Sequence, residues 1–224
     1  KEKQFVLMKL DYLNSISIHN FFINYKENIG NNVLIYIILY KKLVSYISKL
    51  QTKDIVHYDL RPNNILISND TFNPYIIDFG ISLNITTIIN ILNRKKDIKK
   101  QLSSVGKFYI FSPDNCYWCF DIHIISFIIN NYNSLDHKFT YQPSIDHFKK
   151  FVFQNATFKL LSDEFKLNYW RKCTRYLEHL TNYTNLEVIE LLIKHYKTWD
   201  ITSLSMTFLQ LVGLNIEVFE HNKD

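Results

Sequence analysis

His57-Tyr58-Asp59-Leu60-Arg61-Pro62-Asn63-Asn64, followed by Asp78-Phe79-Gly80, is the stretch of sequence that decides the fold. It brings two carboxylates and an amide into one short run. Phosphoryl transfer needs metal ions across the phosphate oxygens and a carboxylate that orients and deprotonates the attacking hydroxyl. Carboxylate and amide oxygens suit a hard cation such as Mg²⁺. The stretch therefore predicts phosphoryl-transfer chemistry, with Asp59 as the base and with Asn64 and Asp78 as metal ligands.

The composition favours one packed, mainly helical domain of the α+β class. The 224 residues are 47% hydrophobic and 16% aromatic, which is enough for a sizeable core. Glycine and proline are scarce, at four each, and this disfavours a turn-rich barrel or sandwich. No internal repeat and no low-complexity linker divides the chain, so one globular unit is the simplest interpretation.

The net charge of +5 is a mild excess that can attract anions such as nucleotide phosphates. It is too small to indicate a nucleic-acid partner. The basic residues cluster at 94–96 and 99–100 without the interleaved aromatic side chains on which single-stranded nucleic acids stack. A solvated basic loop is therefore expected there.

The cysteines and the apolar runs indicate an intracellular, cytoplasmic protein without a membrane anchor. Cys116, Cys119 and Cys173 cannot form a closed disulfide framework, and no secretion signal is recognisable. Cys116 and Cys119 form a CxxC pair, but a zinc site would need a second pair of ligands. The longest apolar run, 33–40, is too short to span a bilayer and predicts a buried helix.

Most of the chain has the periodicity of helices. Apolar residues recur near helical spacing over 32–50 and over 199–212. Several helical patterns occupy 145–196, where Asn185 is a possible cap. Residues 80–121 show no clear period and predict a loop-rich segment.

Short strands are expected around the motifs. A turn at 69–74 would join strands at 65–67 and 75–77 and set Asn64 beside Asp78. The other expected strands lie at 5–8, followed by a polar connector at 9–12, and at 55–56.

The spacing of the motif resembles the catalytic and metal-binding loops of protein kinases. His57-x-Asp59 comes first, Asn64 follows five residues after the aspartate, and Asp-Phe-Gly comes after one hairpin. The resemblance implies a kinase-like C-terminal lobe, in which short β-hairpins carry the catalytic loop, 57–64, and the Asp-Phe-Gly motif. It also implies ATP, Mg²⁺ or Mn²⁺, and a protein substrate. The alternative is that a helix cap, turn residues and surface polar groups share this spacing by chance.

Residues around the base and the metal ligands take expected roles from the same resemblance. Arg61 stands where serine/threonine kinases usually have a lysine that contacts the transferred phosphate; a plain surface or salt-bridging arginine is the alternative. His57 and Phe79 resemble buried spine residues of the family. Gly80 would give backbone freedom beside the metal ligand.

The C-terminal part of the chain resembles the central helix of the family. Trp199-Asp200 would begin this helix, 199–212, and the aspartate would tie down the catalytic loop; a simple helix-terminal carboxylate is the other interpretation. Before it, a helical insertion at 122–198 is similar to divergent serine/threonine kinases of large DNA viruses. This similarity adds a host-cell cytoplasm or a virion to the expected locations.

The implied activation segment covers 78–121. It would end at Tyr117-Trp118-Cys119-Phe120-Asp121, where Asp121 replaces the glutamate of the family's Ala-Pro-Glu-like tripeptide. Pro113-Asp114 is the competing alignment.

The resemblance also implies an adenine pocket. Leu66 would form its apolar floor, Met8 would guard its back, and the backbone of Lys9-Leu10-Asp11 would form the hinge that binds adenine. For Met8 and Leu66, ordinary core packing is the alternative.

The phosphate-gripping half of a kinase is missing from the sequence. No Gly-x-Gly-x-x-Gly occurs, and no upstream strand lysine or its glutamate partner can be assigned. Residues 1–12 would be the end of an N-lobe strand and the hinge, and residues 13–224 the C-lobe. Since the first residue is Lys1, we expect a fragment whose N-lobe lies upstream in the full protein.

Three functions fit this pattern. The first is the C-lobe of an ATP-dependent protein kinase that acts on serine or threonine hydroxyls. The second is a catalytically impaired pseudokinase or interaction module, which the absent lobe and Asp121 favour. The third is a small-molecule kinase of the same fold, although Leu60-Arg61-Pro62 with Asp-Phe-Gly argues for the protein-kinase branch.

The 224-residue chain should bind ATP weakly or not at all, because it has neither a glycine loop nor a strand lysine to hold the phosphates. Isothermal titration calorimetry with MgATP measures this directly, with Mg²⁺ alone as the control. A dissociation constant of about 1 μM, roughly −8 kcal/mol, would contradict the expectation.

Overall fold

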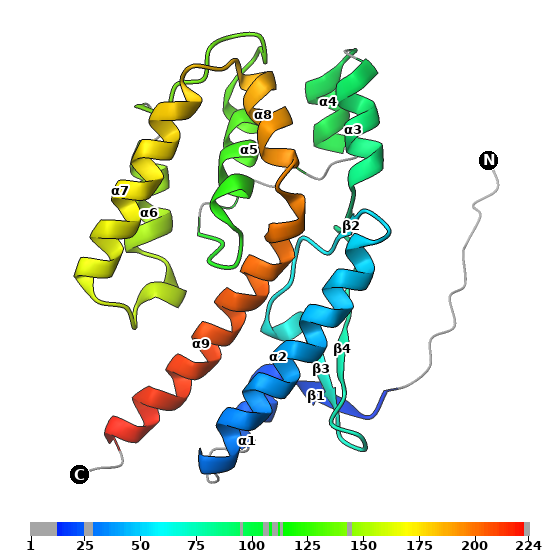
Figure 1. The fold of residues 1–224 in the computed structure, drawn as a ribbon, viewed down its shortest axis with the longest axis vertical. Coiled ribbons are helices and arrows are strands. Elements are labelled where there is room, and N and C mark those ends of the chain that lie inside the picture. Colours follow the sequence, from blue (N-terminus) through cyan, green and yellow to red (C-terminus); the bar gives the residue numbers. More distant parts are fainter. Residues whose placement is uncertain are drawn as a thin grey trace, which may run out of the picture.

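The computed structural model describes residues 13–24, 29–94, 96–104, 108, 112, 114–142 and 145–221. Within these ranges the protein is α+β and mainly helical, with small antiparallel sheets (Figure 1), so the predicted class is confirmed. The strands are β1 (Ser15–Ser17), β2 (Ile55–Val56), β3 (Ile65–Ser68), β4 (Pro74–Ile76) and β5 (Leu83–Asn84). The α-helices are α1 (Ile18–Asn24), α2 (Ile29–Gln51), α3 (Ile85–Arg94), α4 (Ile98–Ser104), α5 (Phe120–Asn131), α6 (Ile145–Phe153), α7 (Asp163–Leu180), α8 (Asn185–Ile193) and α9 (Trp199–His221). Short 3₁₀ helices are η1 (Pro62–Asn64), η3 (Ala156–Phe158) and η4 (Tyr196–Thr198).

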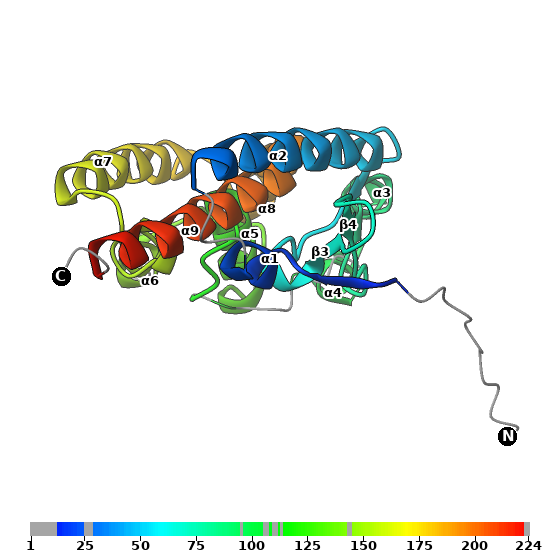
Figure 2. The same cartoon turned by 90° about the horizontal axis from the view of Figure 1, so that it is seen from below.

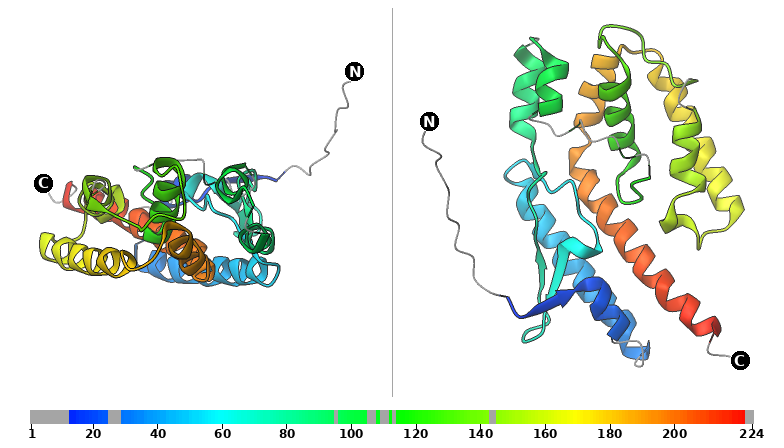
Figure 3. Two further views of the ribbon diagram at one scale, coloured as in Figure 1. Left: turned by 90° about the horizontal axis from the view of Figure 1, so that it is seen from above. Right: turned by 180° about the vertical axis from the view of Figure 1, so that it is seen from behind.

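The long helices α2 and α9 run side by side in opposite directions (Figures 1 and 3). The hydroxyl of Tyr36 donates to the carbonyl of Leu211 at 3.3 Å near one end of the pair. At the other end, Nε2 of Gln51 donates to the carbonyl of Lys197 at 2.6 Å. Both helices were predicted, and each is longer than its apolar pattern indicated, because no proline interrupts them.

The N-terminal half of α2 is only partly buried. Val33, Leu34, Ile37 and Ile38 are 62%, 61%, 46% and 44% exposed, whereas Leu39 is buried. The longest apolar run therefore forms a helix, but the prediction that the helix is buried was wrong for one of its faces. The reason is that α1 and α9 pack against the other side only. No helix within the described ranges has the length and apolar content needed to cross a membrane.

Strands β3 and β4 form the predicted hairpin. They pair antiparallel, with Ile65 opposite Ile76. Just beyond the strands, the N–H of Ile77 donates to the carbonyl of Asn64 at 3.0 Å. Asn64 and Asp78 therefore lie next to one another in the chain fold, at the open end of the hairpin. On the other edge of β3, the strand β1, which no pattern indicated, completes a three-stranded sheet.

The helices predicted within 145–196 are confirmed as α6, α7 and α8. Of these, α6 and α7 lie on the side of α9 away from α2 and the sheet (Figures 1 and 2). The cap of α8 is Thr184 rather than Asn185. Thr184 Oγ1 accepts the N–H of Glu187 at 3.3 Å, and the Glu187 carboxylate accepts the N–H of Thr184 at 2.7 Å. This reciprocal capping box leaves Asn185 as the first helical residue.

The prediction of a loop-rich segment over 80–121 was wrong for much of its length. It contains α3 and α4, and α5 begins before it ends, so that Asp121 lies in the first turn of a helix. Asn84, at the end of β5, precedes α3 and caps its first turn, since its Oδ1 accepts the N–H of Thr87 at 2.8 Å. The apolar residues of α3 that face the core are Ile85, Ile88, Ile91 and Leu92. This is helical spacing, which the neighbouring polar and basic residues obscured.

Two histidines lie between α5 and α6, of which His123 is buried and His147 is half-buried. The ring centroids of His123 and His147 are 5.8 Å apart. Nε2 of His123 lies 3.1 Å from the carbonyl of Asn115, which can only accept, so Nε2 carries the hydrogen. Burial, and then the neighbouring His147, lowers the pKa of His123 to about 3; burial lowers the pKa of His147 to about 4. Both rings are therefore neutral in the folded protein near pH 7.

The free energy of unfolding should fall between pH 7 and pH 5, and His123 should account for part of the loss. Because folding lowers its pKa, this contribution is complete above the unfolded pKa of about 6.5 and is lost as the pH falls toward the folded value. At pH 5 the loss from this residue should be about 2 kcal/mol. Urea unfolding at the two pH values should show a smaller difference for His123→Gln than for the wild type, and the wild-type difference for the exposed control His137→Gln. Equal differences in all three proteins would show that His123 is not responsible.

Candidate active site

Three predicted site residues on the loop between β2 and β3 are in contact. Nδ2 of Asn64 donates to Oδ2 of Asp59 at 2.9 Å and to the Asp59 carbonyl at 2.8 Å. Nε of Arg61 lies 3.4 Å from the same Oδ2. No hydrogen bond within the described residues engages Oδ1 of Asp59. The carboxylate is thus held by one oxygen and presents the other to the surface.

Arg61 is a salt-bridging arginine at the surface, with 48% of its side chain exposed. This matches the alternative interpretation of Arg61 and is also compatible with phosphate contact. The guanidinium has five N–H donors, and its Nε alone lies on Asp59, so the terminal nitrogens remain for an anion.

Asp78 has a left-handed backbone, with φ of 62°. Such a conformation is uncommon for a residue with a side chain and tends to occur at functional sites. Its Oδ1 accepts the N–H of Gly80 at 3.3 Å. The expected backbone freedom of Gly80 is not used, because no described glycine has a positive φ. Glycine provides room instead, since a Cβ at position 80 would lie 3.2 Å from Oδ1 of Asp78.

Asn64 and Asp78 form a donor set that fits a hard cation. Nδ2 of Asn64 donates to Asp59, and this fixes the orientation of the Asn64 amide. No described hydrogen bond engages Oδ1 of Asn64. Asp78 adds a carboxylate at the neighbouring end of the hairpin. Mg²⁺ is usually bound by one or two carboxylates together with waters and substrate phosphates. The described residues contain no cluster of three or more His, Cys, Asp and Glu side chains that would hold a metal without such a substrate.

His57 is buried, as predicted, whereas Phe79 is 46% exposed. Their rings meet edge to face at 4.7 Å between centroids, and Nε2 of His57 donates to the carbonyl of Ile77 at 2.8 Å. The prediction that Phe79 is buried was wrong in this structure, because His57 covers one side of its ring and the end of the hairpin projects the other outward. A shallow hollow of about 300 Å³ beside Phe79 is bordered by Tyr46 and Tyr75.

Asp200 ties the loop after β2, the predicted catalytic loop, to α9. Its Oδ2 accepts the N–H of His57 at 2.7 Å, and its Oδ1 accepts the N–H of Tyr58 at 3.0 Å. The carboxylate is buried at the start of α9. Burial raises its pKa, and the two N–H bonds act in the opposite direction. Asp200 is therefore more than a helix-terminal carboxylate, because both of its oxygens serve a loop that is distant in sequence.

Asp121 joins the start of α5 to the residues before α9. Its Oδ2 lies 3.1 Å from Nδ1 of His195, and most of its side chain is buried. Burial raises the pKa of the Asp121 carboxyl, and His195 opposes this shift. Asp121 therefore has a structural role, as expected, and its partner is His195. In the competing alignment, Asp114 is exposed and Pro113 lies outside the described residues.

The expected adenine pocket is largely outside the described part of the chain. This applies to Met8 and to Lys9-Leu10-Asp11. Leu66 is described and lies in β3, where it pairs with Tyr75 and with Ser17. It is half-buried at the face of the sheet.

Tyr58 and Trp118 contact the candidate site but were not among the predicted site residues. Tyr58 is buried with a left-handed φ of 72°, and its carbonyl accepts the indole N–H of Trp118 at 3.0 Å. Burial also raises the pKa of the Tyr58 phenol well above its usual range. The only local signal was a large aromatic residue directly before the predicted base.

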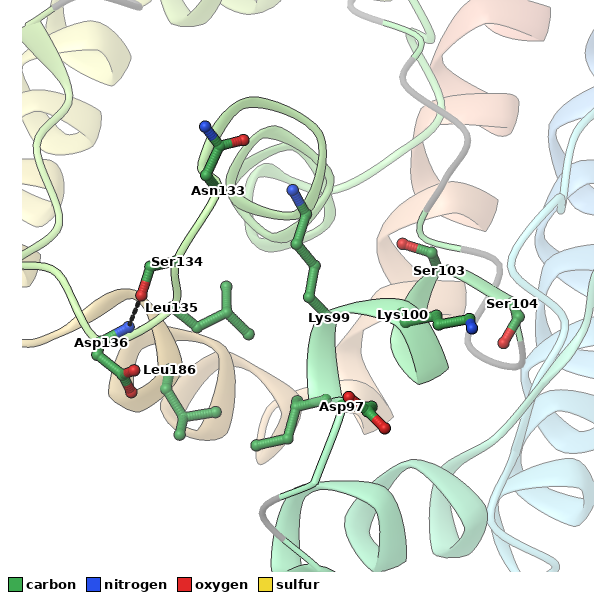
Figure 4. A pocket seen from close by; sticks show the side chains of 11 residues that line it. Asp97, Lys99, Lys100, Ser103, Ser104, Asn133, Ser134, Leu135, Asp136 and Leu186 are labelled. Atoms are coloured by element: carbon green, nitrogen blue, oxygen red, sulfur yellow. Dashed lines mark hydrogen bonds between the residues drawn. The ribbon is translucent and has the colours of Figure 1, made fainter.

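A wider cavity lies away from these residues. It has a volume of about 890 Å³ and opens between α4, residues 133–136 and the start of α8 (Figure 4). Its walls carry Lys99 and Lys100 but also Asp97 and Asp136, so its charges balance. Nζ of Lys99 already donates to the carbonyl of Tyr132 at 2.7 Å. The cavity shares no residue with the candidate active site.

Comparison with protein-family models, with curated proteins and with solved structures finds no match to this chain.

Replacing the Asp200 carboxylate should destabilise the protein. In Asp200→Asn the amide can accept only one of the two N–H bonds, and its NH₂ group would face the other buried donor. The free energy of unfolding in urea should fall by about 3 kcal/mol, since buried donors are left unpaired. The exposed control Asp146→Asn should change it by less than about 0.5 kcal/mol. A loss for Asp200→Asn no larger than that of the control would contradict the assigned role.

Proposed function

We propose that the chain is the catalytic C-terminal lobe of a protein kinase, which transfers the γ-phosphate of ATP to serine or threonine hydroxyls. The observation that carries the proposal is the pair of hydrogen bonds from the backbone of His57 and Tyr58 to Asp200. In the family that the motif resembles, the aspartate of the central helix ties down the catalytic loop. A motif that arose by chance has no reason to be held by a buried carboxylate 142 positions away.

Asp59 would act as the base. Asn64 holds its Oδ2 at 2.9 Å, and Arg61 lies on the same oxygen. Oδ1 is left to align the substrate hydroxyl and to accept its proton as the new O–P bond forms. Because the carboxylate is restrained before the substrate arrives, little reorganisation is needed at that step.

Asn64 and Asp78 would hold the Mg²⁺ or Mn²⁺. When bound, the metal neutralises the negative charge of the phosphate oxygens. The chain contributes the fixed amide of Asn64 and the left-handed backbone that aims Asp78. Arg61 would place its terminal N–H groups on the transferred phosphate and so add a second positive charge near the reaction centre.

A pseudokinase is the second candidate, and one observation favours it. Phe79, which follows the candidate metal ligand Asp78, is half exposed at the end of the hairpin. A small-molecule kinase of the same fold would use the same four groups at the site. The acceptor of the phosphate separates the third candidate from the first.

Expressed from its full reading frame, the protein should transfer ³²P from γ-labelled ATP to a mixture of serine- and threonine-containing peptides. Asp59→Asn removes the base, and Asp78→Ala removes the carboxylate ligand, so each should lower the rate by about 1,000-fold or more. Both should keep the wild-type circular dichroism and urea midpoint, since neither carboxylate supports the core. Asp146→Asn, on the exposed face of α6, should transfer at the wild-type rate.

The outcomes separate the candidates. Undiminished transfer by Asp59→Asn or Asp78→Ala would overturn the assignment of the site. Nucleotide binding without transfer to any acceptor would support the pseudokinase. Transfer to amino-alcohols or aminoglycosides but to no peptide would support a small-molecule kinase.

A further inference from the structure

We propose that Trp118 is a positioning residue for the candidate base. Its indole N–H and its ring hold Tyr58, and through Tyr58 they set the direction of Asp59. The inference rests on the proposed function only for the chemistry that Asp59 performs. The restraint itself is a property of the fold and can be tested without any assay of phosphoryl transfer.

The argument begins with the peptide that joins Tyr58 to Asp59. A peptide unit is planar, so its carbonyl oxygen and the N–H of the next residue turn together. Whatever fixes the carbonyl of Tyr58 therefore also fixes the backbone from which the Asp59 side chain leaves. The bonds to Asp200 restrain the N–H groups of Tyr58 and His57, which belong to the two preceding peptides.

Tyr58 needs such a restraint because its φ of 72° is left-handed. A bulky residue without a local polar side chain does not adopt this conformation unless its surroundings impose it. In this conformation the carbonyl of Tyr58 points into a buried region, where an unpaired acceptor would be unfavourable. The indole N–H of Trp118 is the donor that it meets, at 3.0 Å.

The ring of Tyr58 is enclosed by aromatic side chains. Its centroid lies 5.1 Å from that of Trp118 and 5.8 Å from that of Phe108, in tilted and edge-to-face arrangements. Both neighbours are themselves buried. Trp118 thus contacts Tyr58 twice, at its backbone carbonyl and at its ring. A rotation of either the Tyr58 carbonyl or the Tyr58 ring would therefore disturb a contact with Trp118.

Trp118 is itself held in place from α5. Oδ1 of Asn115 accepts the N–H of Tyr117 at 3.0 Å and that of Trp118 at 3.3 Å. The carbonyl of Asn115 accepts Nε2–H of the buried His123 at 3.1 Å. A continuous series of contacts therefore runs from α5 through Asn115 and Trp118 to the residue before the base.

The simpler alternative is that Trp118 only fills space in the core. Phenylalanine would preserve much of that packing but has no N–H donor. The two explanations therefore differ in what Trp118→Phe does to the backbone at Tyr58 and Asp59. Trp170→Phe is the matched control, because it removes an indole in the same way but on α7. There the ring centroids of Trp170 and Phe153 lie 6.2 Å apart.

Hydrogen exchange followed by NMR on the 224-residue chain provides the first test. In Trp118→Phe the amides of Tyr58 and Asp59 should exchange about 10-fold faster or more than in Trp170→Phe, because the peptide between them loses the hydrogen bond to its carbonyl. Equal exchange rates in the two variants would overturn the proposal and leave Trp118 as a packing residue.

A second measurement needs no variant and so does not depend on how Trp118→Phe folds. In the wild-type protein, a scalar coupling across the hydrogen bond should link Nε1 of Trp118 to the carbonyl carbon of Tyr58. Absence of this coupling, in spectra that show the corresponding couplings within α9, would overturn the proposal.

Measurements of kcat and KM then test whether the contact between Trp118 and Tyr58 affects the candidate base, Asp59. In the protein expressed from its full reading frame, Trp118→Phe should lower kcat by about 10- to 100-fold, since small displacements of a catalytic group have effects of this size. KM for ATP should stay within about 2-fold of the wild-type value, because the indole contacts no group assigned to nucleotide binding. Wild-type kcat in a variant with accelerated exchange would refute the positioning role. If the wild type itself transfers no phosphate, the proposed function fails, and the exchange and coupling results still decide whether Trp118 holds Tyr58.

Discussion

The buried carboxylate of Asp200 is the group on which the geometry of the loop after β2 depends. Its two oxygens take the N–H groups of His57 and Tyr58, at 2.7 and 3.0 Å. These bonds hold a loop whose second residue, Tyr58, has a left-handed backbone and which could not keep this shape by local interactions alone. Asp200 is itself placed by the packing of α9 on α2, so the central pair of helices sets the loop as well as the core.

The candidate site is assembled from parts with different structural origins. The hairpin of β3 and β4 brings Asn64 and Asp78 together, and the loop before it presents Asp59. The segment before α5 adds Trp118 behind that loop. Asp59 is thus supported by the buried Asn64 and, through Tyr58, by the buried Trp118. This kind of support makes a catalytic group rigid, because displacement of one side chain would also disturb the core.

The sequence predicted the parts of this site that are encoded locally. The motif spacing and the turn at 69–74 were enough to predict the hairpin and the meeting of Asn64 with Asp78, because short-range pairing follows from turn chemistry. The resemblance located Asp200. The contact between Tyr58 and Trp118 could not be predicted, since it depends on how a segment 60 positions away folds back. The helix α3 was missed for a different reason: its apolar spacing is regular, but the frequent Asn and Thr residues suggested a loop.

The distance in sequence between the loop and α9 has a consequence for biosynthesis. The bonds from His57 and Tyr58 to Asp200 span 143 and 142 positions, and contacts of such separation close late, because a long loop must first be ordered. On the ribosome, the complete motif is made long before α9 emerges. A nascent chain, or a product truncated before Trp199, therefore carries every residue of the motif and lacks the group that shapes it. Synthesis of α9 is therefore the event that gives the loop its shape.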